Sequence, residues 1–143
     1  MSQPTLSDAA RGFSWLLNGF VEKTAGVTDA VAVSSDGLLM AMSSSLTRAN
    51  AEQVAAIIAG MVSLGNGASS CFGFDSLEQV IVTMRRGFLF LSAISDGSCL
   101  GVVASRGCDI GLVGYQTTLL VERAGTVLTP ALVAELKQEM LVS

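Results

Sequence analysis

The sequence predicts an α+β fold in which a five-stranded antiparallel sheet carries helices on both faces. Short apolar runs are joined by turn signals at Asp36-Gly37, Arg85-Arg86-Gly87 and Asp96-Gly97, as in antiparallel hairpins. Longer segments repeat their apolar residues at the spacing of a helix. The 143 residues have the length of one domain and can bury a real core. The predicted order is α-β-β-α-β-β-β-α, over about residues 10–128, plus a C-terminal helix over about 130–141.

A first helix is predicted over residues 7–23, followed by a hairpin. Ser7 with Asp8 can cap the helix start. The apolar face of this helix consists of Phe13, Leu16, Leu17, Phe20 and Val21, with Trp15 to one side. The strands of the hairpin are expected at 27–34 and 38–43. Asp36-Gly37 supplies the positive φ angles of a two-residue turn between them, and a functional loop is the alternative.

The longest helical signal covers residues 47–70, and the rest of the chain is organised around it. A large apolar stripe consists of Val54, Ile57, Ile58, Met61 and Leu64. An adjacent stripe of small residues consists of Ala55, Ala59, Ser63 and Gly67, with Ala56 and Gly60 alongside. We expect the large stripe to pack on the chain's own sheet and the small stripe to let a second subunit come close. Packing of the small stripe on the same sheet is the alternative.

Three strands and two helices complete the predicted fold. The strands are expected at 77–84, 88–95 and 99–105, and short turns make them antiparallel neighbours. The run 88–95 is apolar on both sides, which suits a middle strand covered by helices on both faces. Asp109 can cap a helix over 110–127, and Thr129-Pro130 is a helix-start signature for the last helix.

Composition excludes several classes of protein. Only 14% of the residues are charged and half are hydrophobic, which indicates that another subunit covers some apolar surface. The net charge of −4 argues against nucleic-acid binding. No uninterrupted apolar run approaches the ~20 residues that span a bilayer, and residues 1–12 lack the pattern of a signal peptide. Cys71, Cys99 and Cys108 are expected to be reduced thiols of a cytoplasmic protein.

The sequence contains no pattern that indicates catalysis, a cofactor or a metal. It has no histidine, which removes Ser-His and Cys-His nucleophilic pairs and the commonest transition-metal ligand. It also lacks a nucleophile elbow, a dinucleotide fingerprint and a phosphate-binding loop. The Gly-rich stretch 65–70 is interpreted as a helix end. Arg85-Arg86, at a hairpin tip, could reach a partner's phosphate as GTPase-activating arginines do, or could simply be solvated.

The order of elements and several local strings resemble the bacterial Roadblock (dynein light chain roadblock) domains. The strings that carry the resemblance are residues 13–41, 51–69, 80–104 and 109–136. The chain looks most like actinobacterial members, in which Asp36-Gly37 lies in the first hairpin and Glu52-Gln53, with Ala56, opens the central helix. These features are apolar patterns and turns, so they indicate the family and no particular site. The layout is also similar to profilin-like ligand domains.

The resemblance implies a non-catalytic homodimer in which the central helices lie together and the third strands pair into one sheet. The predicted dimer interface consists of Ala55, Ala59, Gly60, Ser63, Gly67, Gln79, Ile81 and Thr83. Strand 78–84 would be the open edge that this pairing covers. The predicted contacts with a small Ras-like GTPase are Arg48, Glu52, Arg85 and Arg86.

The sequence therefore predicts a cytoplasmic homodimeric module that binds and regulates a small Ras-like GTPase in bacterial signalling. The resemblance implies that the module acts together with such a GTPase and a sensor histidine kinase. These partners could hold the module at a membrane without its own insertion into the bilayer. A purely structural scaffold for a kinase or membrane complex is one alternative. A small-molecule sensor is another, and it would require a polar cavity, of which the apolar patterning gives no sign.

Overall fold

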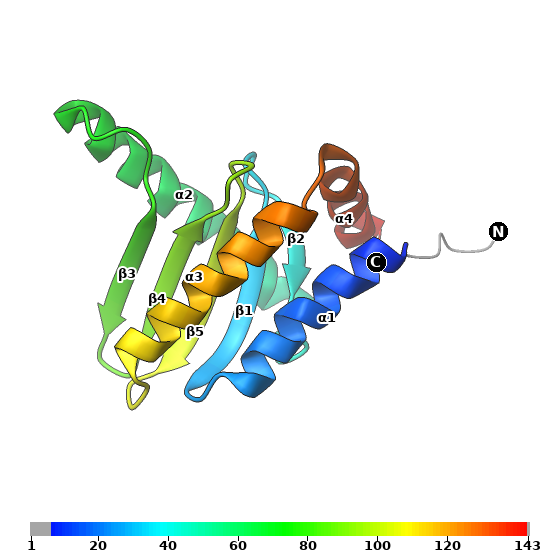
Figure 1. Cartoon of the computed structure of the whole chain (residues 1–143), viewed down its shortest axis with the longest axis horizontal. Coiled ribbons are helices and arrows are strands. Elements are labelled where there is room, and N and C mark those ends of the chain that lie inside the picture. The colour runs from blue at the N-terminus through cyan, green and yellow to red at the C-terminus, as the bar shows by residue number, and fades with distance from the viewer. Residues whose placement is uncertain (1–6, 143) are drawn as a thin grey trace.

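The computed structural model describes residues 7–142 and has the predicted order of helices and strands (Figure 1). The elements are α1 (Asp8–Lys23), β1 (Val27–Val33), β2 (Leu39–Met42), α2 (Arg48–Phe72), β3 (Gln79–Met84), β4 (Gly87–Ala93), β5 (Cys99–Ser105), α3 (Ile110–Val127) and α4 (Pro130–Val142). The expectation about a signal peptide concerns residues 1–12, and residues 1–6 of these lie outside the described residues.

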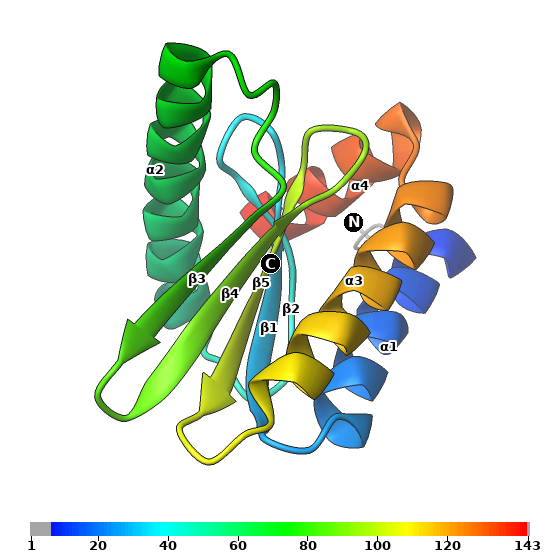
Figure 2. The same cartoon turned by 60° about the vertical axis from the view of Figure 1, so that its left-hand side comes forward.

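The five strands form one antiparallel sheet in the order β2-β1-β5-β4-β3. Helices α1 and α3 cover one face and α2 lies on the other (Figure 2). β4 is an internal strand next to the edge and not the central one, but it is buried on both sides as predicted. Its Phe88 and Phe90 belong to the core under α1 and α3, while Leu89 and Leu91 belong to the core under α2.

Side-chain caps set the helix starts where the sequence predicts them. The hydroxyl of Ser7 accepts the Ala10 N–H at 3.1 Å, and a carboxylate oxygen of Asp109 accepts the Leu112 N–H at 3.1 Å. The Thr129 hydroxyl likewise accepts the Leu132 N–H at 3.1 Å. Each bond satisfies one of the N–H groups that a helix start leaves without an intrahelical partner.

The two Asp-Gly turns differ from the predicted two-residue type. Gly37 has a φ of +85° and Gly97 has a φ of +91°. The aspartate before each glycine has a negative φ, since Asp75 is the only described non-glycine residue with a positive φ. The Ser34 N–H donates to the Leu38 carbonyl and the Ile94 N–H donates to the Ser98 carbonyl, both at 2.8 Å, so each bond closes a loop of three residues. This is the geometry of a type I turn followed by a left-handed glycine. The aspartates act through their side chains: Asp36 accepts from the Ser34 hydroxyl, and Asp96 accepts the Ser98 N–H at 3.0 Å.

Helix α4 covers the β2 edge of the sheet, a role that the sequence did not reveal (Figure 1). Leu132 and Leu136 are buried in the core on the α1 side, and Met140 packs against the core on the α2 side. The Lys137 ammonium lies 3.2 Å from a carboxylate oxygen of Asp36 in the β1–β2 turn. The helix therefore connects both layers of the domain across one sheet edge.

Candidate interaction surface

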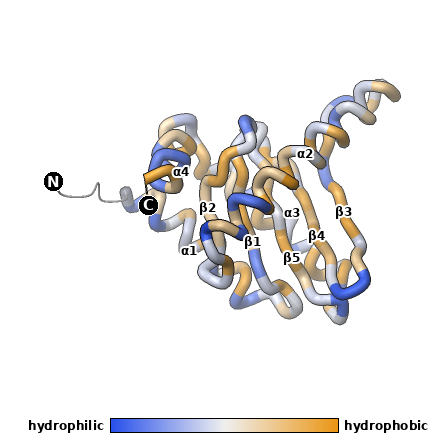
Figure 3. The backbone as a smooth tube through the Cα atoms, turned by 180° about the vertical axis from the view of Figure 1, so that it is seen from behind, coloured by the Kyte–Doolittle hydropathy of each residue, from blue (hydrophilic) through white to orange (hydrophobic). Residues whose placement is uncertain are grey.

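Strand β3 is the opposite edge of the sheet, and within residues 7–142 no strand pairs with its outer side. Its side chains remain accessible: Ile81 is 46% exposed and Met84 is 47% exposed. The prediction that this strand forms an open edge is confirmed. An edge of this kind presents unpaired N–H and C=O groups and favours pairing with another chain. Figure 3 shows that apolar β3 leads into a hydrophilic β3–β4 turn, which contains Arg85 and Arg86.

Helix α2 packs on the sheet along its first half only. Ala51, Ala55 and Ile58 are buried there against the second core. The second half extends past the strands (Figures 1 and 2), where Leu64 is 77% exposed and Phe72 is 70% exposed. A helix that packs on its own sheet only in part leaves apolar surface for another contact.

The predicted assignment of the two stripes of α2 is partly wrong. Ile57 and Leu64, placed in the core-facing stripe, are exposed, and Ala55, placed at a dimer interface, is only 2% exposed in the chain's own core. The physical reason is close approach to the sheet. Ile58 occupies the space above Gly101, where an added Cβ would lie 2.4 Å from the Ile58 Cδ1 atom. Small residues beside Ile58 let the helix backbone sit that near its own strands.

The rest of the predicted dimer interface is accessible to different degrees. Ala59 is half-buried beside the β1–β2 turn, and a Cβ on Gly37 would lie 3.2 Å from its Cβ. Gly60, Ser63 and Gly67 are exposed. The β3 residues Gln79, Ile81 and Thr83 are exposed as well. These six exposed positions keep their place in the predicted interface.

The four predicted GTPase contacts do not form one cluster. The Arg48 guanidinium donates to the Met140 carbonyl of α4 and lies 3.8 Å from the Glu52 carboxylate, at the α2 start. This part of α2 lies over β1 and β2, whereas Arg85 and Arg86 follow β3 at the other end of the strand order. Arg48 therefore has a structural role in holding α4, and the prediction that it contacts a GTPase is left without support from its surroundings.

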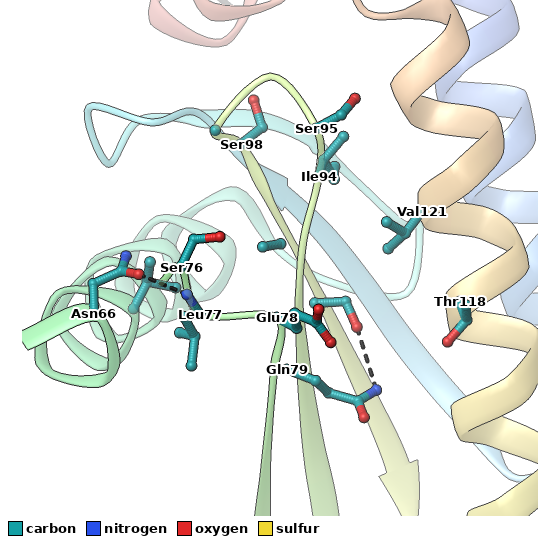
Figure 4. A pocket seen from close by; sticks show the side chains of 14 residues that line it. Asn66, Ser76, Leu77, Glu78, Gln79, Ile94, Ser95, Ser98, Thr118 and Val121 are labelled. Atoms are coloured by element: carbon teal, nitrogen blue, oxygen red, sulfur yellow. Dashed lines mark hydrogen bonds between the residues drawn. The ribbon is translucent and has the colours of Figure 1, made fainter. Parts of the chain in front are cut away.

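A hollow of about 520 Å³, lined by both polar and apolar side chains, opens beside the start of β3, between the far half of α2 and the side of α3 (Figure 4). The Asn66 side-chain oxygen accepts the Leu77 N–H at 2.9 Å, and the Gln79 side-chain amide donates to the Ser92 hydroxyl at 3.4 Å. Among the described residues, Glu78 is the one charged residue in its wall. The polar side chains of this wall come from loops and element ends far apart in sequence, so the apolar patterning of the sequence does not reveal them.

By length and composition alone, α2 could also cross a bilayer. Its best 18-residue window has a mean hydropathy of 1.4, and 11% of that window is buried. The helix contains no uninterrupted apolar run of this length, but its mean hydropathy is still high enough for a membrane span. Such values also occur in helices of soluble domains, and the first half of α2 packs on the sheet of this chain.

The cysteines form no reactive or metal-binding group in the part of the chain that the structure describes. All three are free thiols. Burial raises the pKa of the Cys99 thiol to about 11, so it stays protonated at neutral pH and is a poor nucleophile or ligand. No group of three or more cysteine or acidic side chains within residues 7–142 is placed to hold a metal ion.

Comparison with known proteins agrees with this architecture. The sequence profile of the Roadblock/LC7 domain family matches residues 13–104. A Roadblock/LC7 domain from Streptomyces avermitilis is 35% identical, with a TM-score of 0.73 over 78% of this chain and 92% of that one. No curated protein sequence matches the chain.

Two further structures share the fold at low identity. Myxococcus xanthus MglB is 14% identical, with a TM-score of 0.75 over 81% of this chain and 94% of that one. Acanthamoeba castellanii profilin IB is 16% identical, with a TM-score of 0.53 over 80% of this chain and 97% of that one. At these identities the likeness concerns the fold alone, and it supports the predicted profilin-like layout.

Proposed function

Because the chain belongs to the Roadblock/LC7 domain family, we propose that it is a non-catalytic homodimeric module that binds and regulates a small Ras-like GTPase. One observation carries the proposal: the β3 edge and the outer side of α2 both expose large apolar side chains, and no described strand pairs with the outer side of β3. Ile57, Leu64, Ile81 and Met84 are all more than 40% exposed there. Exposed apolar surface of this kind marks interaction sites in stable proteins.

The surface suits a second copy of the chain. Gly60 lies on the exposed side of α2, and no atom lies within 4 Å of the position a Cβ would take. A neighbouring helix could therefore approach closely between the flanking large side chains. Pairing of β3 with its two-fold mate would satisfy the edge and give a closed dimer.

The dimer would act as a two-fold platform for the GTPase. It would bind one nucleotide state or reshape the switch loops, which are ordered by the γ-phosphate and released on hydrolysis. In this proposal no side chain of the dimer takes part chemically in GTP hydrolysis. Glu52, Arg85 and Arg86 are exposed and are the accessible members of the predicted GTPase contacts.

The test uses a small Ras-like GTPase from the same organism as this chain. GTP hydrolysis and nucleotide release are measured with and without the purified dimer. A change in either rate supports regulation, and tight binding that leaves both rates unchanged would establish the scaffold alternative instead. Failure to bind the GTPase at all would contradict both the regulatory function and the scaffold function toward this GTPase.

The hollow beside β3 favours small-molecule sensing as a second candidate function. Its wall offers hydroxyl and amide groups and one carboxylate, and no lysine or arginine, so it suits a neutral or cationic polar molecule. A thermal-shift screen of polyols, amines and nucleosides tests this function. A stabilising compound should lose its effect in the Gln79→Leu variant, and a screen with no stabilising compound would contradict sensing.

A further inference from the structure

Only alternate residues of β3 offer backbone groups to the open edge. In an antiparallel ladder, each residue points both its N–H and its C=O to the same side, and successive residues alternate. The Ala93 N–H donates to the Glu78 carbonyl at 2.9 Å, so Glu78 and the even-numbered residues after it face β4. The residues that face outward are therefore Gln79, Ile81 and Thr83.

One register of a two-fold symmetric strand pair places every outward-facing residue opposite another outward-facing residue. A two-fold axis between antiparallel strands places one residue opposite its own copy. With Ile81 at the axis, Gln79 lies opposite Thr83 of the other strand, and all outward groups of both strands are paired. With Val80 at the axis, Thr83 of each strand has no outward-facing strand residue opposite it. With Val82 at the axis, Gln79 of each strand has none.

The charges at the two ends of β3 agree with antiparallel pairing of two copies. Glu78 precedes the strand, and Arg85 and Arg86 follow it. Neither arginine forms an ion pair among the described residues of its own subunit. Antiparallel pairing brings the acidic start of one strand to the basic end of the other.

We propose that two copies pair through β3 with Ile81 opposite its own copy, and that this register joins Arg86 to the partner subunit's Glu78. The inference rests on the proposed homodimer and specifies its geometry. Glu78 lies opposite the partner subunit's Met84, and the partner subunit's Arg86 lies in the β3–β4 turn two residues further along. That diagonal separation is within reach of a long side chain.

The register also buries the apolar side chains of the edge. Ile81 shares a face with Phe90, its partner in β4, and in the dimer it contacts the partner subunit's Ile81 on that face. On the α2 side, the half-buried Val80 lies opposite the partner subunit's Val82. Arg86 is thus assigned to the dimer and not to a GTPase.

Disulfide cross-linking tests the register. In a Cys71→Ser, Cys108→Ser background, in which only buried Cys99 remains, Ile81→Cys is compared with Val80→Cys and Val82→Cys. Opposed hydrogen-bonded residues have Cα atoms about 5.5 Å apart, which suits a disulfide. Mild oxidation should cross-link Ile81→Cys and leave the other two variants mostly uncross-linked.

Other results would overturn the register in distinguishable ways. Preferential cross-linking of Val80→Cys or Val82→Cys would give a shifted register. No cross-linking in any variant, while sedimentation still shows a dimer, would leave a dimer formed elsewhere and remove the edge pairing. A monomer by sedimentation in the unsubstituted protein would remove the proposed homodimer as well.

A charge exchange tests the ion pair. Arg86→Glu and Glu78→Arg should each raise the dimer dissociation constant about tenfold, because two symmetric pairs are replaced by like charges. The double variant should return to near the unsubstituted value, and Arg85→Glu is the matched control with a smaller effect. A double variant as weak as the single ones, with circular dichroism showing an intact fold, would overturn the pairing of Arg86 with the partner subunit's Glu78.

Discussion

The two edges of the sheet differ in what covers them. At the β2 edge, α4 buries Leu132 and Leu136 and forms an ion pair with the β1–β2 turn. At the β3 edge, no described residue pairs with the outer side of the strand, and Ile81 is exposed. Both edges carry the same backbone chemistry, so the difference comes from one C-terminal helix.

This difference decides which assemblies are open to the chain. A sheet with two free edges can add copies head to tail, and such heterologous contacts extend into filaments unless they close. Covering β2 leaves β3 as the open edge among the described strands, and in an assembly of identical copies that edge pairs with its own copy. The match to the family profile ends at residue 104, before α4 begins, so the edge cover lies outside the matched region.

The largest expected effect on the free energy of unfolding comes from weakening the packing of α4 on the sheet. Leu136→Ala removes a side chain that is 3% exposed and should lower the free energy of unfolding by about 2–5 kcal/mol. Urea denaturation measures the change. Leu141→Ala, on the same helix but exposed, should change it by about 0.5 kcal/mol or less. Equal effects of the two substitutions would mean that α4 does not seal the edge through its buried residues.

A pair of prolines compares the two sides of β3. Val82→Pro removes an N–H that bonds β4 and should cost about 1–3 kcal/mol of folding stability for the unpaired carbonyl, plus a steric term. Ile81→Pro removes an outward N–H, which an edge strand tolerates, and should abolish the dimer while the monomer stays folded. Thermal denaturation and sedimentation report the two quantities. If Ile81→Pro unfolds the protein as Val82→Pro does, the outward assignment of Ile81 is wrong.

Gly60→Glu should move folding and dimerisation in opposite directions. Replacing an exposed helical glycine with a good helix former should stabilise the subunit by up to about 1 kcal/mol. A charge near the two-fold axis should weaken the dimer by tenfold or more, about 1.4 kcal/mol. Gly60→Ala is the control, with the gain in stability and no charge. A dimer of unchanged affinity would place the contact away from α2.

The sequence predicts the fold well because its strongest signals are local. Ser7, Asp109 and Thr129 act within three residues of themselves, so their capping bonds do not depend on the tertiary structure. The glycine positions of the two Asp-Gly turns are predictable for the same reason. The turn length was wrong because a single left-handed glycine serves a three-residue loop as well as a two-residue one.

The interaction surface is less predictable because it depends on how segments meet. Which stripe of α2 is buried follows from the contact of Ile58 with Gly101, more than forty positions along the chain. The pattern of apolar residues gives two adjacent stripes and does not say which one the sheet takes. The Arg48 bond to the Met140 carbonyl similarly joins elements that no local pattern connects.

The smallest expected effect concerns the ion pair that ties α4 to the β1–β2 turn. A hydrogen bond from Ser34, followed by the nearby Lys137 ammonium, lowers the pKa of Asp36 below its ordinary value of 3.8. Because the folded-state pKa is the lower one, the stabilisation is complete above about pH 4 and is lost as the pH falls through the folded-state pKa. Asp36 is largely exposed, so Lys137→Ala should cost well under about 1 kcal/mol near neutral pH. Urea denaturation at about pH 7, 5 and 3 should show the difference between Lys137→Ala and the unsubstituted protein shrinking at the lowest pH. A difference that persists there would mean that Lys137 stabilises α4 through its packing against the turn and not through the charge of Asp36.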